Sequence, residues 1–100
     1  MMAAVPQADV VVVNPTHFAV ALEYDGSKPA PECVAKGQDL IALQIRRLAE
    51  EAGVPVIEDR PLARSLHAAI EVGQLVPEEL FQAVAQVLAY VYRVAKRKAV

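Results

Sequence analysis

The first apolar segment of the chain is a continuous block, not an alternating one. Residues 10–13 are four consecutive valines. A run of β-branched residues without polar alternation predicts a strand that is buried on both faces. The run stops at Asn14-Pro15, because proline has no N–H to donate to a ladder and Asn-Pro favours a turn. Residues 18–24 are again mostly apolar and predict a second strand.

Turn-forming residues separate these strands from two shorter ones. Residues 25–31 read Asp-Gly-Ser-Lys-Pro-Ala-Pro and predict a turn and loop. Residues 33–35 predict a short third strand that ends at Gly37. Residues 54–58 predict another short strand later in the chain.

Helical periodicity begins at Gln38 and returns twice. The first helix is expected to be capped by Gly53, and its apolar positions are Ile41, Ile45, Leu48 and Ala52, with Leu40 and Leu43 beside them. The second is expected to begin at Pro61 and to close at Gly73, and its apolar face is Leu62, Leu66, Ala69 and Ile70.

Pro77-Glu78-Glu79 predicts the start of the last helix, with proline first and two acids at the positive end of the dipole. Its apolar stripe is Leu80, Phe81, Val84, Val87, Leu88, Val91, Val94 and Ala95. The basic residues expected at its negative end are Arg93, Lys96, Arg97 and Lys98. Together the elements predict one α/β domain over residues 1–100, with a small mixed sheet of about four strands packed with about three to four helices.

Charge and cysteine content exclude several kinds of site. A net charge of −2 and a pI near 5.6 argue against a nucleic-acid partner. The single cysteine excludes an internal disulfide, and with only two histidines no metal site or cofactor is expected. No apolar run approaches the roughly 20 residues that cross a bilayer.

The Asn14-Pro15 bond has its own chemistry. Because proline lacks an N–H, the following amide cannot attack the asparagine side chain, and deamidation by that route is closed. The remaining route is attack by the Asn14 side-chain nitrogen on its own main-chain carbonyl, which forms a succinimide and expels the proline nitrogen. Thr16 and His17 are polar neighbours that would assist. Asn-Pro is also a common plain turn, so the residues alone leave both interpretations open.

Asn14-Pro15-Thr16-His17, placed after a valine strand, resembles the NPTH site of the FlhB/YscU family of export-switch proteins in flagellar and virulence type III secretion. The resemblance continues in family order through residues 34–37, 41–42, 54–55, 61–66, 73, 76–77 and 84–89. Residues 34–37 and the long last helix are similar to the flagellar branch.

The resemblance implies a cytoplasmic C-terminal domain of a bacterial inner-membrane protein, with residues 1–8 as a linker from an upstream membrane region. It implies a single self-cleavage between Asn14 and Pro15, with Thr16 and His17 in the catalytic site, and no turnover of other substrates. Cleavage would switch export from rod and hook to filament substrates. The implied partners are export-apparatus components, the hook-length control protein, export substrates and the domain's own N-terminal fragment.

The resemblance also implies an apolar patch for export substrates at Ala30, Pro31, Ala85 and Leu88. Simple core packing of Ala85 and Leu88 is the alternative. Two alternatives to the whole function are an injectisome counterpart and a docking module that does not cleave. Cys33 is expected to be a buried apolar residue or a passive surface thiol, and His67 a solvent-facing helix residue.

Overall fold

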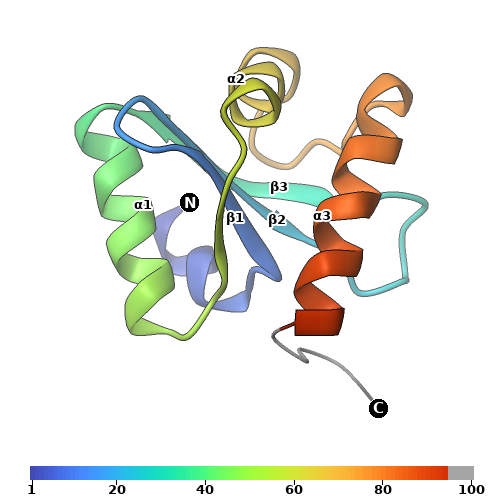
Figure 1. Ribbon diagram of the computed structural model, residues 1–100, viewed down its shortest axis with the longest axis horizontal. Coiled ribbons are helices and arrows are strands. Elements are labelled where there is room, and N and C mark those ends of the chain that lie inside the picture. Colours follow the sequence, from blue (N-terminus) through green and yellow to red (C-terminus); the bar gives the residue numbers. More distant parts are fainter. Residues whose placement is uncertain (95–100) are drawn as a thin grey trace.

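A four-stranded mixed sheet separates two layers of helices in the computed structural model, which describes residues 1–94 (Figure 1). The strand order is β3-β2-β1-β4. The strands are β1 (Val10–Asn14), β2 (Phe18–Glu23), β3 (Glu32–Gln38) and β4 (Val56–Glu58). β1 is central because it pairs antiparallel with β2 and parallel with β4. The predicted fold class is confirmed.

One helical layer consists of the 3-10 helix η1 (Met2–Gln7) and α1 (Leu40–Glu51). The opposite layer consists of α2 (Arg60–Ala69), the short 3-10 helix η2 (Glu78–Leu80) and α3 (Phe81–Val94) (Figure 1). Within residues 1–94, none of the helices has the length and apolar character needed to span a bilayer. The predicted helix-end residues Ala95, Lys96, Arg97 and Lys98 lie outside the described part.

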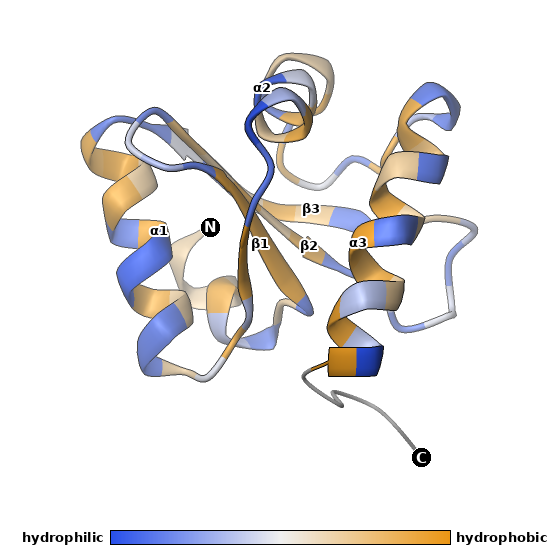
Figure 2. Ribbon diagram, viewed as in Figure 1, coloured by the Kyte–Doolittle hydropathy of each residue, from blue (hydrophilic) through white to orange (hydrophobic). Residues whose placement is uncertain are grey.

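Both faces of β1 are covered, which explains its unbroken run of valines. Val10 and Val12 belong to the core beneath α2 and α3, whereas Val11 and Val13 belong to the core beneath α1 and η1. All four are at most 2% exposed. Figure 2 shows the strands coloured largely as hydrophobic between the two helical layers. The predicted doubly buried strand is confirmed.

The apolar face predicted for α1 is wrong in part. The buried residues are Ala42, Ile45 and Ala49, whereas Leu40 and Ile41 are 77% and 41% exposed. Leu43 is also exposed, and Leu48 is half-buried. The cause is close packing: the core on this side is rich in alanine from both the helix and the sheet, namely Ala19, Ala21, Ala35, Ala42 and Ala49. Small side chains on both surfaces bring α1 near the sheet and rotate its larger residues outward.

β3 extends further than predicted, through Gly37 to Gln38. A Cβ at Gly37 would lie 2.2 Å from Ile41 Cγ2 and 2.7 Å from Ile41 Cβ. Glycine is therefore needed here for the close approach of α1, and not to end the strand. At the other end of α1 the predicted cap is confirmed: Gly53 has a φ of 75°, and the Val54 N–H donates to the Ala49 carbonyl at 2.8 Å.

The boundaries of α2 differ from the prediction. It begins at Arg60 behind Asp59, whose carboxylate accepts the Leu62 N–H at 3.2 Å. It ends at Ala69, well before Gly73. Leu62, Ala63 and Leu66 are its buried residues, and Ala69, predicted on the apolar face, is exposed. The N-terminal difference arises because Asp59 is a good N-cap, which places Pro61 in the second helical position.

Pro77 is an N-cap, not the first residue of the last helix, and a 3-10 turn precedes α3. Val84, Val87, Leu88 and Val91 are buried as predicted, but Phe81 and Val94 are 42% and 58% exposed. These two lie at the ends of α3.

Residues 1–8, expected to be a linker, include the 3-10 helix η1. Val5 in this helix is fully buried and packs in the α1 core. The segment preceding β1 is therefore part of the packed domain.

Candidate functional site

The Asn-Pro turn, residues 14–17, connects the central strand to its neighbour. Asn14 is the last residue of β1 and lies opposite Phe18, the first residue of β2. The His17 N–H donates to the Asn14 main-chain carbonyl oxygen at 2.7 Å, which closes the turn. Asn14 and Pro15 are half-buried, whereas Thr16 and His17 are exposed. The four predicted residues are thus adjacent in one tight turn.

Two backbone hydrogen bonds tie this turn to neighbouring segments. The Asp59 N–H donates to the Val13 carbonyl at 3.0 Å. The Asp39 N–H donates to the His17 carbonyl at 2.9 Å. The chain is therefore held immediately before Asn14 and again at the end of the turn.

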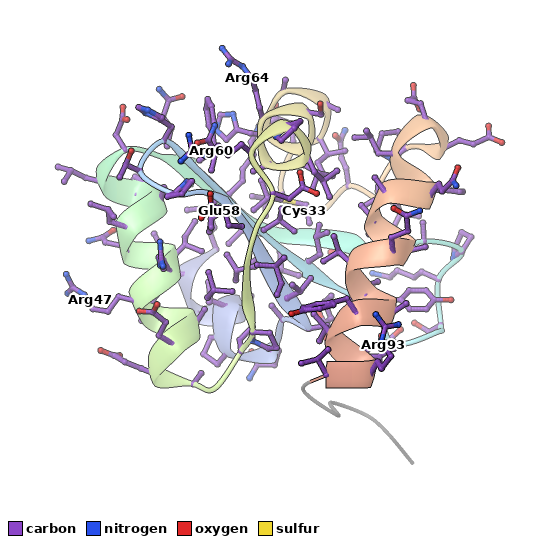
Figure 3. The ribbon with its side chains drawn as sticks, in the orientation of Figure 1. Cys33, Arg47, Glu58, Arg60, Arg64 and Arg93 are labelled. Atoms are coloured by element: carbon purple, nitrogen blue, oxygen red, sulfur yellow. The ribbon has the colours of Figure 1, made fainter. Side chains whose placement is uncertain are left out.

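A shallow depression of about 250 Å³ lies beside the Asn-Pro turn. Its lining comes from the turn, β2, the end of β3, the connection between β3 and α1, and α2, and consists of Asn14, His17, Phe18, Gln38, Asp39 and Arg64. Figure 3 shows Arg64 extending outward from α2. The sequence interpretation missed Gln38, Asp39 and Arg64. For Asp39 a signal exists, since an aspartate between a strand and a helix is a typical N-cap.

The hydrogen bond to the Asn14 carbonyl matters for reactivity. A donor on a carbonyl oxygen polarises the carbonyl and stabilises the negative charge that develops there under attack. The His17 N–H is such a donor, fixed by the backbone. Within residues 1–94, no group of three or more His, Cys, Asp or Glu side chains is arranged to hold a metal ion.

A second surface feature is the apolar groove of about 230 Å³ between α3 and the β2–β3 loop. It is lined by Tyr24, Pro29, Ala30, Pro31, Phe81, Val84, Ala85 and Leu88. The structure therefore brings together Ala30, Pro31, Ala85 and Leu88, the four residues of the predicted patch. Leu88 belongs to the core, as the packing alternative held, but Ala85 is exposed at the groove.

Hydrogen bonds and an ion pair hold the loop that forms one wall of the apolar groove. The Val76 N–H donates to the Pro31 carbonyl at 2.8 Å. Asp25 accepts hydrogen bonds from the Ser27 hydroxyl at 2.6 Å and the Ser27 N–H at 2.8 Å, and these bonds lower the pKa of its carboxyl. Lys28 forms an ion pair with Glu32 across the base of the loop.

Cys33 is fully buried in the core beneath α2 and α3. Burial raises the pKa of its thiol to about 11, so the thiol is a poor nucleophile at neutral pH. Of the two expectations for Cys33, the buried apolar residue is confirmed and the surface thiol is wrong.

His67 differs from the expected solvent-facing residue. It is half-buried, and its ring lies 4.7 Å from that of Phe18, at an angle of 42°. Burial, followed by the nearby Lys36 charge, lowers the pKa of its imidazole. The Lys36 ammonium donates to the His67 carbonyl at 2.8 Å. His67 thus supports Phe18, the first residue of β2 after the turn.

The fold and the Asn-Pro turn are those of a family of type III export proteins. The chain belongs to this family, the FlhB HrpN YscU SpaS family, whose sequence profile matches residues 1–91. Within this family it is similar to flagellar biosynthetic protein FlhB. It is 52% identical to the protein of Bacillus subtilis (strain 168) over 98 residues, which cover 97% of this chain and 27% of the relative. It is 53% identical to that of Escherichia coli (strain K12) over 97 residues, which cover 96% and 25%. The chain thus spans about a quarter of the length of these relatives.

Solved structures of the family have the same fold. The cytoplasmic domain of FlhB from Shewanella putrefaciens matches with a TM-score of 0.91 and 47% identity, covering 95% of this chain and 74% of that one. An EscU C-terminal domain with an asparagine-to-alanine substitution matches with a TM-score of 0.85 and 43% identity, covering 89% and 90%.

Proposed function

We propose that this domain is the self-cleaving specificity switch of flagellar type III protein export, cut once between Asn14 and Pro15. The observation that carries the proposal is the Asn-Pro turn itself. It ends a fully buried central strand, and the Asn14 carbonyl accepts the His17 N–H at 2.7 Å.

The reaction is an intramolecular cyclisation. The Asn14 side-chain nitrogen attacks the Asn14 main-chain carbonyl carbon, and a new C–N bond closes a succinimide. The bond from that carbon to the Pro15 nitrogen breaks, and the proton lost by the side-chain nitrogen is delivered to the Pro15 nitrogen. Water then opens the succinimide and leaves a carboxyl end on the first fragment. Each molecule reacts once, so the domain is not a turnover enzyme.

Three features of the turn favour this reaction over slow spontaneous chemistry. The backbone ties at Val13 and His17 restrict the conformations of Asn14, and a positioned reactant has a lower entropic barrier. The His17 N–H stabilises the developing oxyanion. The exposed Thr16 and His17 side chains are the nearest sequence neighbours suited to proton transfer.

The similarity to flagellar FlhB proteins supports a place in the flagellar export apparatus and disfavours an injectisome counterpart. There the domain works at the cytoplasmic face of the bacterial inner membrane, as the C-terminal part of an integral membrane protein. Its partners are other components of the apparatus, the hook-length control protein and export substrates. The cut changes the preference from rod and hook substrates to filament substrates.

The apolar groove is the proposed docking site for export substrates. Its volume of about 230 Å³ suits a few apolar side chains and not a folded domain. Proline residues in its wall have little conformational entropy to lose on binding, and the 42% exposed Phe81 offers an aromatic contact. The occupant is therefore a short apolar segment of an export substrate.

The experiment is a time course of intact mass on purified protein. The wild type should yield two fragments, residues 1–14 and 15–100. Asn14→Ala should stay whole, because the nucleophile is gone, and should stay folded, because the strand remains. Gln44→Ala, which removes an exposed amide from α1, is the matched control and should cut like the wild type. A wild type that stays whole would support the docking module instead, and an Asn14→Ala chain cut at the same bond would exclude cyclisation.

A further inference from the structure

Asp39 has a strained backbone next to the Asn-Pro turn. Its φ of 55° and ψ of −120° lie outside the regions that side-chain-bearing residues favour. Among residues 1–94 it is the one non-glycine residue with a positive φ. Such a conformation is unfavourable and persists only where the surroundings impose it.

The surroundings that impose this conformation are the end of β3 and the start of α1. Asp39 alone connects β3, which ends at Gln38, to α1, which begins at Leu40. Strand and helix are in close contact at this corner, because a Cβ at Gly37 would lie 2.2 Å from Ile41 Cγ2. Asp39 is the N-cap of α1, yet its carboxylate makes no capping hydrogen bond. The Asp39 N–H lies in the peptide group that continues β3 beyond Gln38, and it donates to the His17 carbonyl, 2.9 Å away. The strained φ lets the chain leave the sheet for α1 directly after this amide while the hydrogen bond is kept.

The peptide groups of His17 connect this corner to the reactive bond. The His17 carbonyl accepts from Asp39, and the His17 N–H donates to the Asn14 carbonyl at 2.7 Å. If the Asp39 N–H turned away, the His17 carbonyl would lose its hydrogen bond to Asp39. The His17 N–H would then no longer be held in position against the Asn14 carbonyl. Asp39 itself does not bond to Asn14 in this arrangement, so any influence on Asn14 passes through His17.

We propose that Asp39 is a positioning residue for self-cleavage, acting through its strained backbone amide and not through its carboxylate. This inference rests on the proposed function. It predicts opposite behaviour for two substitutions. Asp39→Gly removes the carboxylate but adopts a positive φ without strain, so the N–H stays in place. Asp39→Val is a genuine outlier at this φ, so the corner relaxes and the N–H turns away.

The test measures cutting rates by intact mass for both variants. Asp39→Gly should cut at the wild-type rate or faster. Asp39→Val should cut roughly ten- to a hundredfold more slowly, because a misplacement of about 1 Å can cost about a hundredfold in rate. The matched control is Gly53→Val, which puts the same residue at a φ of 75° at the opposite end of α1, where a Cβ meets nothing within 4 Å. It should lose stability yet cut normally.

A second readout does not depend on cutting. In the Asn14→Ala background, hydrogen exchange of the His17 and Asp39 amides should accelerate in Asp39→Val and stay unchanged in Asp39→Gly and Gly53→Val. If Asp39→Val does not fold, Asp39→Ala takes its place, with a smaller effect in the same direction.

The outcomes separate the two proposals. A folded Asp39→Gly that cuts slowly would show that the carboxylate is needed and overturn the inference, as would an Asp39→Val that cuts and exchanges like the wild type. A wild type that never cuts would refute the proposed function, and the amide exchange would still show whether Asp39 holds the turn.

Discussion

Under the proposed function, the N-terminal fragment, residues 1–14, should remain bound after cutting, and Val12→Ala should weaken its attachment. This fragment supplies the central strand, whose four valines are at most 2% exposed. At roughly 1.5–3 kcal/mol each, their burial contributes about 6–12 kcal/mol, and Val5 adds a further buried side chain. Backbone hydrogen bonds to β2 and β4 are also retained. The opposing cost of association is about 4–15 kcal/mol, so the fragment should stay, but with a limited margin.

Val12→Ala tests this margin. Val12 is fully buried in the core beneath α2 and α3, and the substitution removes the equivalent of two methylene groups. At about 0.8 kcal/mol each, the loss is roughly 1.6 kcal/mol before any cavity cost. Because about 1.4 kcal/mol is a factor of ten, the dissociation constant of the fragment should rise more than tenfold.

The assay is size exclusion of fully cut protein at increasing urea, with mass analysis of each peak. In buffer, both fragments should elute together, and Val12→Ala should release residues 1–14 at lower urea than the wild type. Gln7→Ala, an exposed change on the same fragment, should release it as the wild type does. The reasoning fails if a folded 15–100 fragment elutes alone from the wild type, or if Val12→Ala and Gln7→Ala behave alike.

Under the proposed function, Ala85→Asp places a carboxylate in the apolar groove and should weaken binding of a fluorescent peptide that carries a short apolar segment of an export substrate more than tenfold. Gln86→Asp, an exposed neighbour outside the groove lining, should not, and equal loss in both would refute the docking site. Because burial raises the pKa of Cys33 to about 11 from an ordinary value of 9.0, its contribution to stability should be complete below pH 9 and be lost as pH rises towards 11. The free energy of unfolding of Cys33→Ala should therefore decline less between pH 9 and pH 11 than that of the wild type. Identical pH profiles for the two proteins would contradict the raised pKa of Cys33.

The sequence predicts β1 well because a strand that is buried on both faces must be a continuous apolar run. With both faces covered, residues 10–13 must all be apolar, and the Asn-Pro dipeptide must end the strand. The Asn-Pro turn was identifiable because the residues that carry its chemistry are consecutive in the sequence.

The face of α1 was not predictable from its own residues. Leu40, Ile41 and Leu43 offer more apolar surface than Ala42 and Ala49, yet the alanines face the sheet. The choice depends on the small residues that β2 and β3 present to the helix, which is information from distant parts of the chain. The N-cap signal of Asp39 does not reveal its positive φ, because the one-residue connection between β3 and α1 depends on how strand and helix pack.

The parallel pairing of β1 with β4 also has a consequence for biosynthesis. β1 is complete at residue 14, but the ties that hold the Asn-Pro turn come from Asp39 and Asp59, much later in the chain. A nascent chain emerging from the ribosome therefore lacks these two hydrogen bonds on either side of the turn until residues through Asp59 have left the exit tunnel and joined the sheet. Under the proposed function, chains that end before Asp59 or fail to assemble the sheet stay whole, and the broken peptide bond shows that the sheet around the turn was formed.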